Sequence, residues 1–253
     1  MNSRLLDGQC ALVTGGSGVI GSAICRRLAE NGAAVAVACK KNSAGAEAVA
    51  KEILAAGGRA VVVQGDLTDE GQVRALVAEA AKALGKIDVL VNDAWPGWRG
   101  GNIEDTPWQD YQWYLDQMVQ AAYHTIRAVL PGMKERRWGR IVNLGTTAAY
   151  ELNERHLPYI TGKGALLALT RGVARDYGAY NILVNMVSPG QVWRDKGPQD
   201  PGFAPPHTKR AALGRVVTPW EVAGAVVFFV SPLSDGITGV QLPVCAGMMM
   251  HIG

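Results

Sequence analysis

The sequence has 253 residues, of which 48% are hydrophobic and 19% charged, and its formal net charge is +3. This composition excludes a disordered chain and suits one large α/β domain. The basic pairs are scattered, so we expect no nucleic-acid partner, and no apolar run approaches the roughly 18 residues of a membrane span. The four cysteines form no C-x-x-C pair and the N-terminus leaves no room for a signal peptide, so we expect a cytoplasmic protein.

Short apolar runs alternate with amphipathic helical segments along the whole chain. We predict strands at 10–14, 33–39, 60–64, 87–91, 140–145, 181–187 and 239–244, and helices that include 19–30, 46–54, 73–84, 158–178 and 219–230. A further long helix is expected to stop at Pro131 and Gly132. This alternation predicts a single domain with a parallel sheet covered on both faces. The Pro/Gly-rich stretch 190–215 is too long for an ordinary connection and is predicted to be a lid over a site.

A glycine loop, "TGGSGVIG", follows the first predicted strand and opens the first helix. It can be written G-x-G-x-x-G from Gly16 or T-G-x-x-G-x-x-G from Thr14. Backbone N–H groups and the helix dipole at such a loop bind a pyrophosphate. Val19 stands where some such loops carry glycine, which is harmless if its φ stays negative. We therefore predict a dinucleotide site.

The end of the second predicted strand indicates which dinucleotide binds. An acid about 20 residues beyond the glycines would bind the 2′-hydroxyl of NAD. This strand instead ends in Cys39, Lys40 and Lys41. Ammonium groups attract a 2′-phosphate and a carboxylate would repel it, so NADP(H) is the predicted cofactor.

A tyrosine and a lysine, Tyr159 and Lys163, are four residues apart on one predicted helix and so share a face. A lysine cation beside a phenol stabilises the phenolate and lowers a tyrosine pKa that is normally about 10. The pair predicts a general acid or base.

Together with the loop and with "IDVLVNDA", "RIVNLGT" and "VSPG", this pair resembles the short-chain dehydrogenase/reductase family over essentially the whole chain. The resemblance is strongest to its 3-oxoacyl-(acyl carrier protein) reductase-like members. It implies a Rossmann-type doubly wound parallel sheet of about seven strands. It also implies that Tyr159 protonates a carbonyl oxygen and that Lys163 holds the nicotinamide ribose. Thr146, thirteen residues before the tyrosine, takes the place of the family serine, and its hydroxyl can still orient a substrate oxygen.

The resemblance implies cofactor contacts along the whole site. These residues are Gly15, Ser17, Gly18, Ile20, Lys40, Lys41, Asp66, Leu67, Asn92, Ala94, Tyr159, Lys163, Pro189, Gly190 and Val192. It also implies a homo-oligomer, either a tetramer or a dimer, and no metal.

Several positions depart from the family pattern. Met118 stands where the family carries a proton-relay asparagine, and a methionine cannot hold the relay water. Either Gln117 or Gln120 substitutes, or protons take another path, or the enzyme is slow. Trp95 replaces the last glycine of N-N-A-G, and Arg194 replaces a threonine that often binds the cofactor carboxamide.

Tryptophans gather in the segments that would surround the substrate. We expect Trp95, Trp98, Trp113 and Trp193, with Arg99 or Arg194, to line the pocket, while His156 and His207 are alternative acids. The first hypothesis is an NADPH-dependent reductase acting on a small-molecule carbonyl, β-ketoacyl or bulky and aromatic, either free or carrier-bound. The alternatives are a non-redox isomerase, dehydratase or cyclase, and a dinucleotide-binding sensor.

Overall fold

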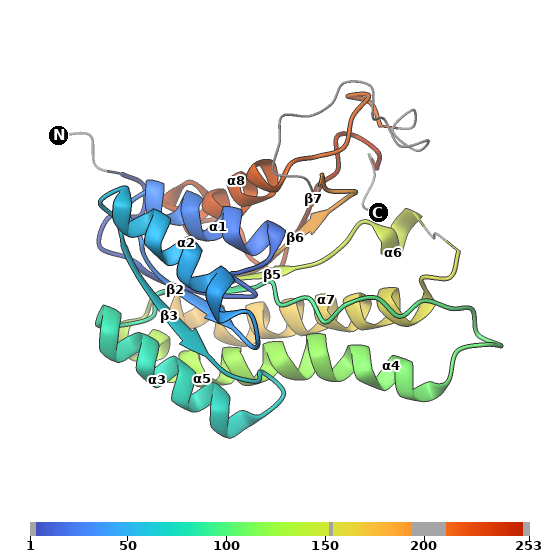
Figure 1. Cartoon of the computed structure of the whole chain (residues 1–253), viewed down its shortest axis with the longest axis horizontal. Coiled ribbons are helices and arrows are strands. Elements are labelled where there is room, and N and C mark those ends of the chain that lie inside the picture. The colour runs from blue at the N-terminus through green and yellow to red at the C-terminus, as the bar shows by residue number, and fades with distance from the viewer. Residues whose placement is uncertain (1–3, 152–153, 194–210, 250–253) are drawn as a thin grey trace.

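The computed structural model describes residues 4–151, 154–193 and 211–249. Seven strands form one parallel sheet in the order β3-β2-β1-β4-β5-β6-β7 (Figure 1). The strands are β1 (Cys10–Thr14), β2 (Ala34–Cys39), β3 (Arg59–Gln64), β4 (Val89–Asn92), β5 (Gly139–Leu144), β6 (Ile182–Pro189) and β7 (Gln241–Val244). The expected doubly wound parallel sheet is confirmed.

The helices cover both faces of the sheet, as Figure 1 shows. One layer holds α1 (Val19–Glu30), α2 (Ser43–Ala55) and α8 (Pro219–Val230). The other layer holds α3 (Glu70–Leu84), α4 (Trp108–Tyr114), the π-helical turn η1 (Leu115–Gln120), α5 (Ala121–Arg136) and α7 (Leu157–Tyr177). Three short pieces complete the order: α6 (Ala148–Glu151), η2 (Gly178–Tyr180) and η4 (Pro232–Ser234).

Burial follows from this layering. Every residue of β1, β2, β4, β5 and β6 is buried, whereas the edge strands β3 and β7 are partly exposed. Strands covered on both faces need apolar side chains at successive positions, which explains runs such as "CALV" and "VAVAC". The continuous apolar runs in the sequence therefore indicate strands that helices cover on both faces.

The predicted end of α5 at Pro131 and Gly132 is wrong. The helix continues through Pro131 and ends at Arg136, where Arg137 adopts a left-handed conformation with φ of 51°. A proline removes one backbone hydrogen bond but leaves the rest of the helix intact when packing holds it. Here Val129, Leu130 and Met133 are buried on either side of the proline.

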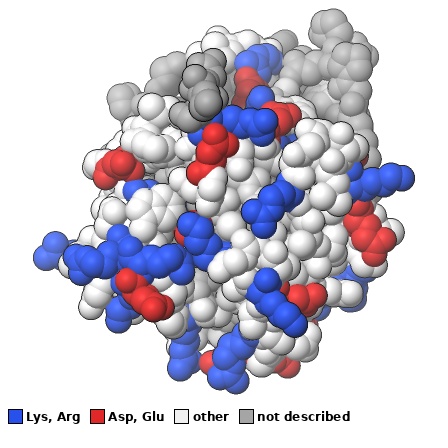
Figure 2. All heavy atoms as spheres, turned by 90° about the vertical axis from the view of Figure 1, so that its left-hand side faces the viewer, with Lys and Arg blue, Asp and Glu red and all other residues white. Residues whose placement is uncertain are grey.

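The predicted lid at 190–215 falls mostly outside the described residues, which resume at Ala211. Its two described ends lie together, because Trp193 donates its backbone N–H to the carbonyl of Val217. In the described part of the chain, no helix has the length and apolar character needed to cross a membrane. Basic and acidic side chains are both spread over the face in Figure 2.

Candidate active site

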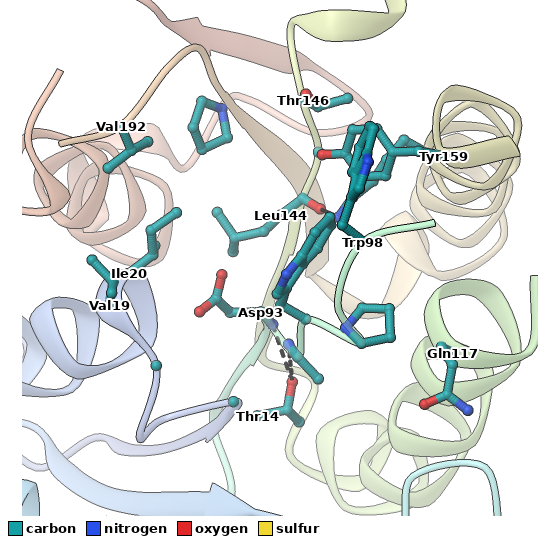
Figure 3. A pocket seen from close by; sticks show the side chains of 18 of the residues that line it. Thr14, Val19, Ile20, Asp93, Trp98, Gln117, Leu144, Thr146, Tyr159 and Val192 are labelled. Atoms are coloured by element: carbon teal, nitrogen blue, oxygen red, sulfur yellow. Dashed lines mark hydrogen bonds between the residues drawn. The ribbon is translucent and has the colours of Figure 1, made fainter. Parts of the chain in front are cut away.

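A cavity of about 1370 Å³ opens at the carboxyl ends of the neighbouring strands β1 and β4. The strand order reverses direction at this point, since β2 follows β1 on one side and β4 lies on the other. Ligands of doubly wound sheets bind at such switch points. Figure 3 shows the cavity with α1 on one side and α7 on the other. Ser17, Gly18, Val19 and Ile20 line the α1 side, and Thr146, Tyr159 and Lys163 line the far end.

The glycine loop forms one wall of the cavity without any side-chain cap. Gly15 has a φ of +67°, which favours glycine, and Val19 is not among the residues with positive φ. Gly18 is the N-cap of α1 and caps it with no side chain, so the first N–H groups of the helix remain available to an anion. A Cβ on Gly21 would lie 2.2 Å from the carbonyl oxygen of Gly15, so only glycine lets the loop and helix pack this closely.

The adenosine end of the cavity contains an ion pair. The Lys40 ammonium lies 2.5 Å from a carboxylate oxygen of Asp66, and both residues line the cavity with Lys41 and Leu67. Hydrogen bonds from Lys40 and Thr68 hold the pKa of Asp66 below its usual value despite burial. Lys41 is exposed, and no ion pair is found for it among the described residues. Lys41 can therefore bind an anionic group of a ligand at this end of the cavity.

The residues that follow β4 form the floor of the cavity. The Thr14 hydroxyl accepts hydrogen bonds from the backbone N–H groups of Asp93 (3.0 Å) and Ala94 (3.2 Å), as drawn in Figure 3. Asn92 turns the other way: its amide donates to Asn143, and its oxygen accepts from Thr125. The structure therefore places Asn92 in the frame beneath the cavity, whereas Ala94 lines it.

The predicted catalytic residues Thr146, Tyr159 and Lys163 lie together at the end of β5 and the start of α7. The side chains of Thr146 and Tyr159 are hydrogen-bonded to each other. Lys163 is buried and its ammonium donates to the carbonyl of Leu144, the last residue of β5. Because Leu144 ends β5 and Thr146 follows it by two residues, the end of this strand fixes the tyrosine and the lysine relative to each other.

The expected lowering of the Tyr159 pKa by Lys163 is not found. Burial raises the pKa of Tyr159 to about 12, and the hydrogen bond from Thr146 opposes that rise. Burial also lowers the pKa of Lys163 to about 8, while the charge of Asp93 raises it. The buried lysine bonds to a backbone carbonyl, so desolvation controls both groups. Tyr159 is thus a protonated donor at neutral pH.

Aromatic rings surround Tyr159. Its ring centroid lies 5.3 Å from that of Trp95, 5.8 Å from that of Trp98 and 5.7 Å from that of Tyr114. Trp98 also packs edge-on against His156, at 4.6 Å. Trp95 and Trp98 are about half exposed, so their free faces border the cavity rather than the core. His156, predicted as an alternative acid, lines the wall of this cavity.

The remaining predicted site residues fall into two groups. Trp113, Gln117, Pro189, Gly190, Val192 and Trp193 line the cavity. Arg194 and His207 lie outside the described residues. Arg99 instead points to the outer side, where its guanidinium stacks on Trp113 at 4.1 Å and pairs with Asp110. No group of three or more potential metal ligands occurs in the described ranges.

Met118 occupies the π-helical turn and is buried, with its sulfur 3.4 Å from where a Cβ on Gly162 would be. Met118 therefore packs against α7 one residue before Lys163. Of the two glutamines predicted as substitutes, Gln117 lines the cavity from η1 (Figure 3).

Asp93 is a cavity residue that the sequence reasoning missed. Asp93 occupies the second position of the N-N-A-G-like element, where an acid replaces an amide. Its carboxyl lies in the cavity beside the start of α1 and accepts a hydrogen bond from the Gly21 N–H. Burial raises its pKa to about 8, against opposing effects of Lys163 and Gly21. The signal was present in "VNDA", in which Asp93 stands between two residues that match the family.

The site fits a nicotinamide dinucleotide on its own geometry: a long cavity, an uncapped helix start at one end, and at the other a partly buried Tyr159 with a buried Lys163. Comparison with known proteins agrees. A family model described as enoyl-(acyl carrier protein) reductase matches residues 16–249. L-fucose dehydrogenase of Rattus norvegicus is 32% identical over 98% of this chain and 92% of its own length.

Two solved structures extend the comparison to the fold. A 7α-hydroxysteroid dehydrogenase in complex with NADH and 7-oxo-glycochenodeoxycholic acid has a TM-score of 0.89 and 32% identity, covering 97% of this chain and 96% of that one. A short-chain dehydrogenase from Burkholderia cenocepacia in complex with NADP has a TM-score of 0.85 and 36% identity, covering 96% and 99%. The chain belongs to the short-chain dehydrogenase/reductase family of oxidoreductases.

Proposed function

We propose that this enzyme reduces a bulky, planar ketone to a secondary alcohol with NADPH. The observation that carries the proposal is the ring cluster around Tyr159. Trp95 and Trp98 both pack edge-on against the phenol and expose their other surfaces to the cavity. Apolar pockets with few polar groups select apolar ligands, and indole faces favour flat ones. A small hydroxy acid would leave these rings uncovered.

The protein's own groups divide the work of reduction. When bound, the nicotinamide supplies the hydride. The Thr146 hydroxyl orients the carbonyl oxygen beside Tyr159, to which it already hydrogen-bonds. Tyr159, protonated at neutral pH because burial raises its pKa to about 12, donates its proton to that oxygen. Lys163 holds the nicotinamide ribose.

The preference for NADPH rests on the lysines at the end of β2. Lys40 is paired with Asp66, and Lys41 stands exposed at the same end of the cavity. A 2′-phosphate would gain a charge-assisted hydrogen bond from Lys41. Similar proteins differ in this respect, since one similar structure was solved with NADH and another with NADP. We further propose that the enzyme is a cytoplasmic homo-oligomer, as the family resemblance implies.

The test is an NADPH oxidation assay across a panel that runs from small ketones through β-ketoacyl thioesters to fused-ring ketones. We expect turnover to rise with the planar apolar area of the ketone. Turnover confined to small ketones would contradict the substrate class. Conversion of a panel member with no change in nicotinamide absorbance would instead favour a non-redox isomerase, dehydratase or cyclase. Tight NADPH binding with no turnover of any ketone would favour a sensor.

A further inference from the structure

The carboxyl of Asp93 lies where the chain brings three elements together. The parallel register pairs Asn92 of β4 with Asn143 of β5, so the following residues, Asp93 and Leu144, are also neighbours. The Lys163 ammonium of α7 donates a hydrogen bond to the carbonyl oxygen of Leu144. Asp93 accepts the Gly21 N–H of α1. In Figure 3 the Asp93 carboxyl points into the cavity between Ile20 and Leu144.

Gly162, which precedes Lys163 in α7, packs against an apolar wall. On the side of η1 and α4 the wall consists of the buried Met118 sulfur and the Tyr114 side chain, both close to Gly162 of α7. A thioether is a weak acceptor and donates no proton. On the cavity side stands Asp93, whose charge interacts with that of Lys163. Lys163 and Asp93 both line the cavity, so a proton can reach Lys163 from the cavity side.

We propose that Asp93 is a positioning residue that resupplies the proton of Lys163. It takes over a task for which position 118, a methionine in this chain, has no suitable polar group. This inference rests on the proposed function. In each reduction Tyr159 gives its hydroxyl proton to the substrate oxygen. Its phenolate then takes a proton from the Lys163 ammonium, the neutral amine takes one from the Asp93 carboxyl through a cavity water, and the carboxylate is reprotonated by solvent water.

The protonation properties of the pair suit such an exchange. Burial raises the pKa of Asp93 and lowers that of Lys163, each to about 8. These opposite shifts bring the two pKa values closer together, which lowers the free-energy cost of moving a proton between the two groups. The other titratable groups that interact with Asp93 are Tyr159 on α7 and Cys25 on α1, and burial raises the pKa of both, so both stay protonated at neutral pH. They do not compete for the proton.

The alternative is that Asp93 only ties β4 to the glycine loop through Gly21. Asp93→Asn separates the two roles, because an amide of the same shape still accepts the Gly21 N–H but cannot exchange a proton. We expect the variant to bind NADPH within about twofold of wild type in a fluorescence titration. We expect kcat for the best ketone of the panel to fall at least tenfold, with a larger solvent deuterium isotope effect and recovery on addition of imidazole buffer.

Titration of the pair gives a readout independent of turnover. In protein labelled with ¹³C at the aspartate carboxyls, the signal missing from Asp93→Asn is that of Asp93. We expect it to titrate near neutral or alkaline pH and to move to higher pH in Lys163→Met, because a cation that favours the carboxylate has been removed. An Asp93 signal that titrates at the ordinary aspartate pH, or that does not respond to Lys163→Met, would overturn the proposal.

Failure of this inference differs from failure of the proposed function. If Asp93→Asn keeps full kcat and an unchanged isotope effect while Tyr159→Phe is inactive, the reductase stands and the relay through Asp93 is wrong. If Tyr159→Phe is as active as wild type, the proposed function falls first.

Discussion

The indole of Trp95 packs edge-on against the phenol of Tyr159, with ring centroids 5.3 Å apart and planes at 84°. A residue that replaces a family glycine thus touches the proposed proton donor directly. The contact makes the size of the residue at position 95 a determinant of which ketones reach Tyr159.

Replacement of Trp95 by glycine should change substrate choice. Loss of the indole contact with the ketone should raise KM for fused-ring ketones about fivefold, because aromatic pairs contribute about 1 kcal/mol beyond their buried area. Small ketones should lose nothing. The measurement is KM across the ketone panel, with Trp108→Ala as control: Trp108 is 64% exposed and stacks on Tyr111 away from the cavity. Equal effects on large and small ketones would argue against a specificity role.

Replacement of Thr146 tests the hydrogen bond to Tyr159. Because Thr146 lowers the pKa of the phenol, Thr146→Ala should raise it further above its usual value. In the alcohol-oxidising direction the reactive form is the phenolate, so the rate should rise with pH, and in Thr146→Ala that rise should shift to higher pH. We expect kcat to fall about 10- to 100-fold, the loss of one well-placed donor.

Thr146→Ser is the matched control, since it keeps the hydroxyl and removes one methyl group. It should restore both the rate and the pH profile of alcohol oxidation. A Ser variant as impaired as the Ala variant would show that packing of the methyl group, and not the hydroxyl, is what the position requires.

Lys41→Asp tests the choice between the two dinucleotides. Loss of one charge-assisted hydrogen bond and gain of a repelling carboxylate should weaken NADPH binding by at least about tenfold, while NADH binding stays unchanged or improves. The measurement is the dissociation constant of each dinucleotide for wild type and for Lys41→Asp. Lys51→Asp, on the exposed side of α2, is the control and should change neither. Parallel weakening of NADPH and NADH in Lys41→Asp would refute a role for Lys41 at the 2′-phosphate.

Gly21→Ala tests the close approach of α1 to the glycine loop. The added Cβ would lie 2.2 Å from the Gly15 carbonyl oxygen and 2.9 Å from the Asp93 carboxyl. We expect the free energy of unfolding to fall by about 1–3 kcal/mol, as for other overpacked sites, and NADPH affinity to fall with it. Gly164→Ala in α7, where a Cβ would meet nothing within 4 Å, should be neutral or slightly stabilising. Chemical denaturation compares the two.

Pattern reasoning on the sequence predicted the order of strands and helices because each buried strand needs an apolar run and each helix an apolar face. It failed at Pro131, where tertiary packing holds a helix that a local rule ends. It also placed Lys163 beside Tyr159 correctly but gave the wrong direction for the tyrosine pKa, because spacing along a helix carries no information about burial.

Two features of the site needed three-dimensional structure. Asp93 and Lys163 are 70 positions apart, and only the register of β4 against β5 brings them to one cavity. The Lys40–Asp66 pair likewise joins the ends of β2 and β3, and it distinguishes Lys40 from Lys41, which look equivalent in the sequence.

The central claim is that Tyr159 is the proton donor in a ketone reduction. The most direct measurement is the kcat of wild type and Tyr159→Phe with NADPH and the best fused-ring ketone of the panel, in samples shown to bind NADPH equally. The account predicts a loss of at least about 100-fold, the contribution of a positioned general acid. A phenylalanine variant within a few fold of wild type would contradict it.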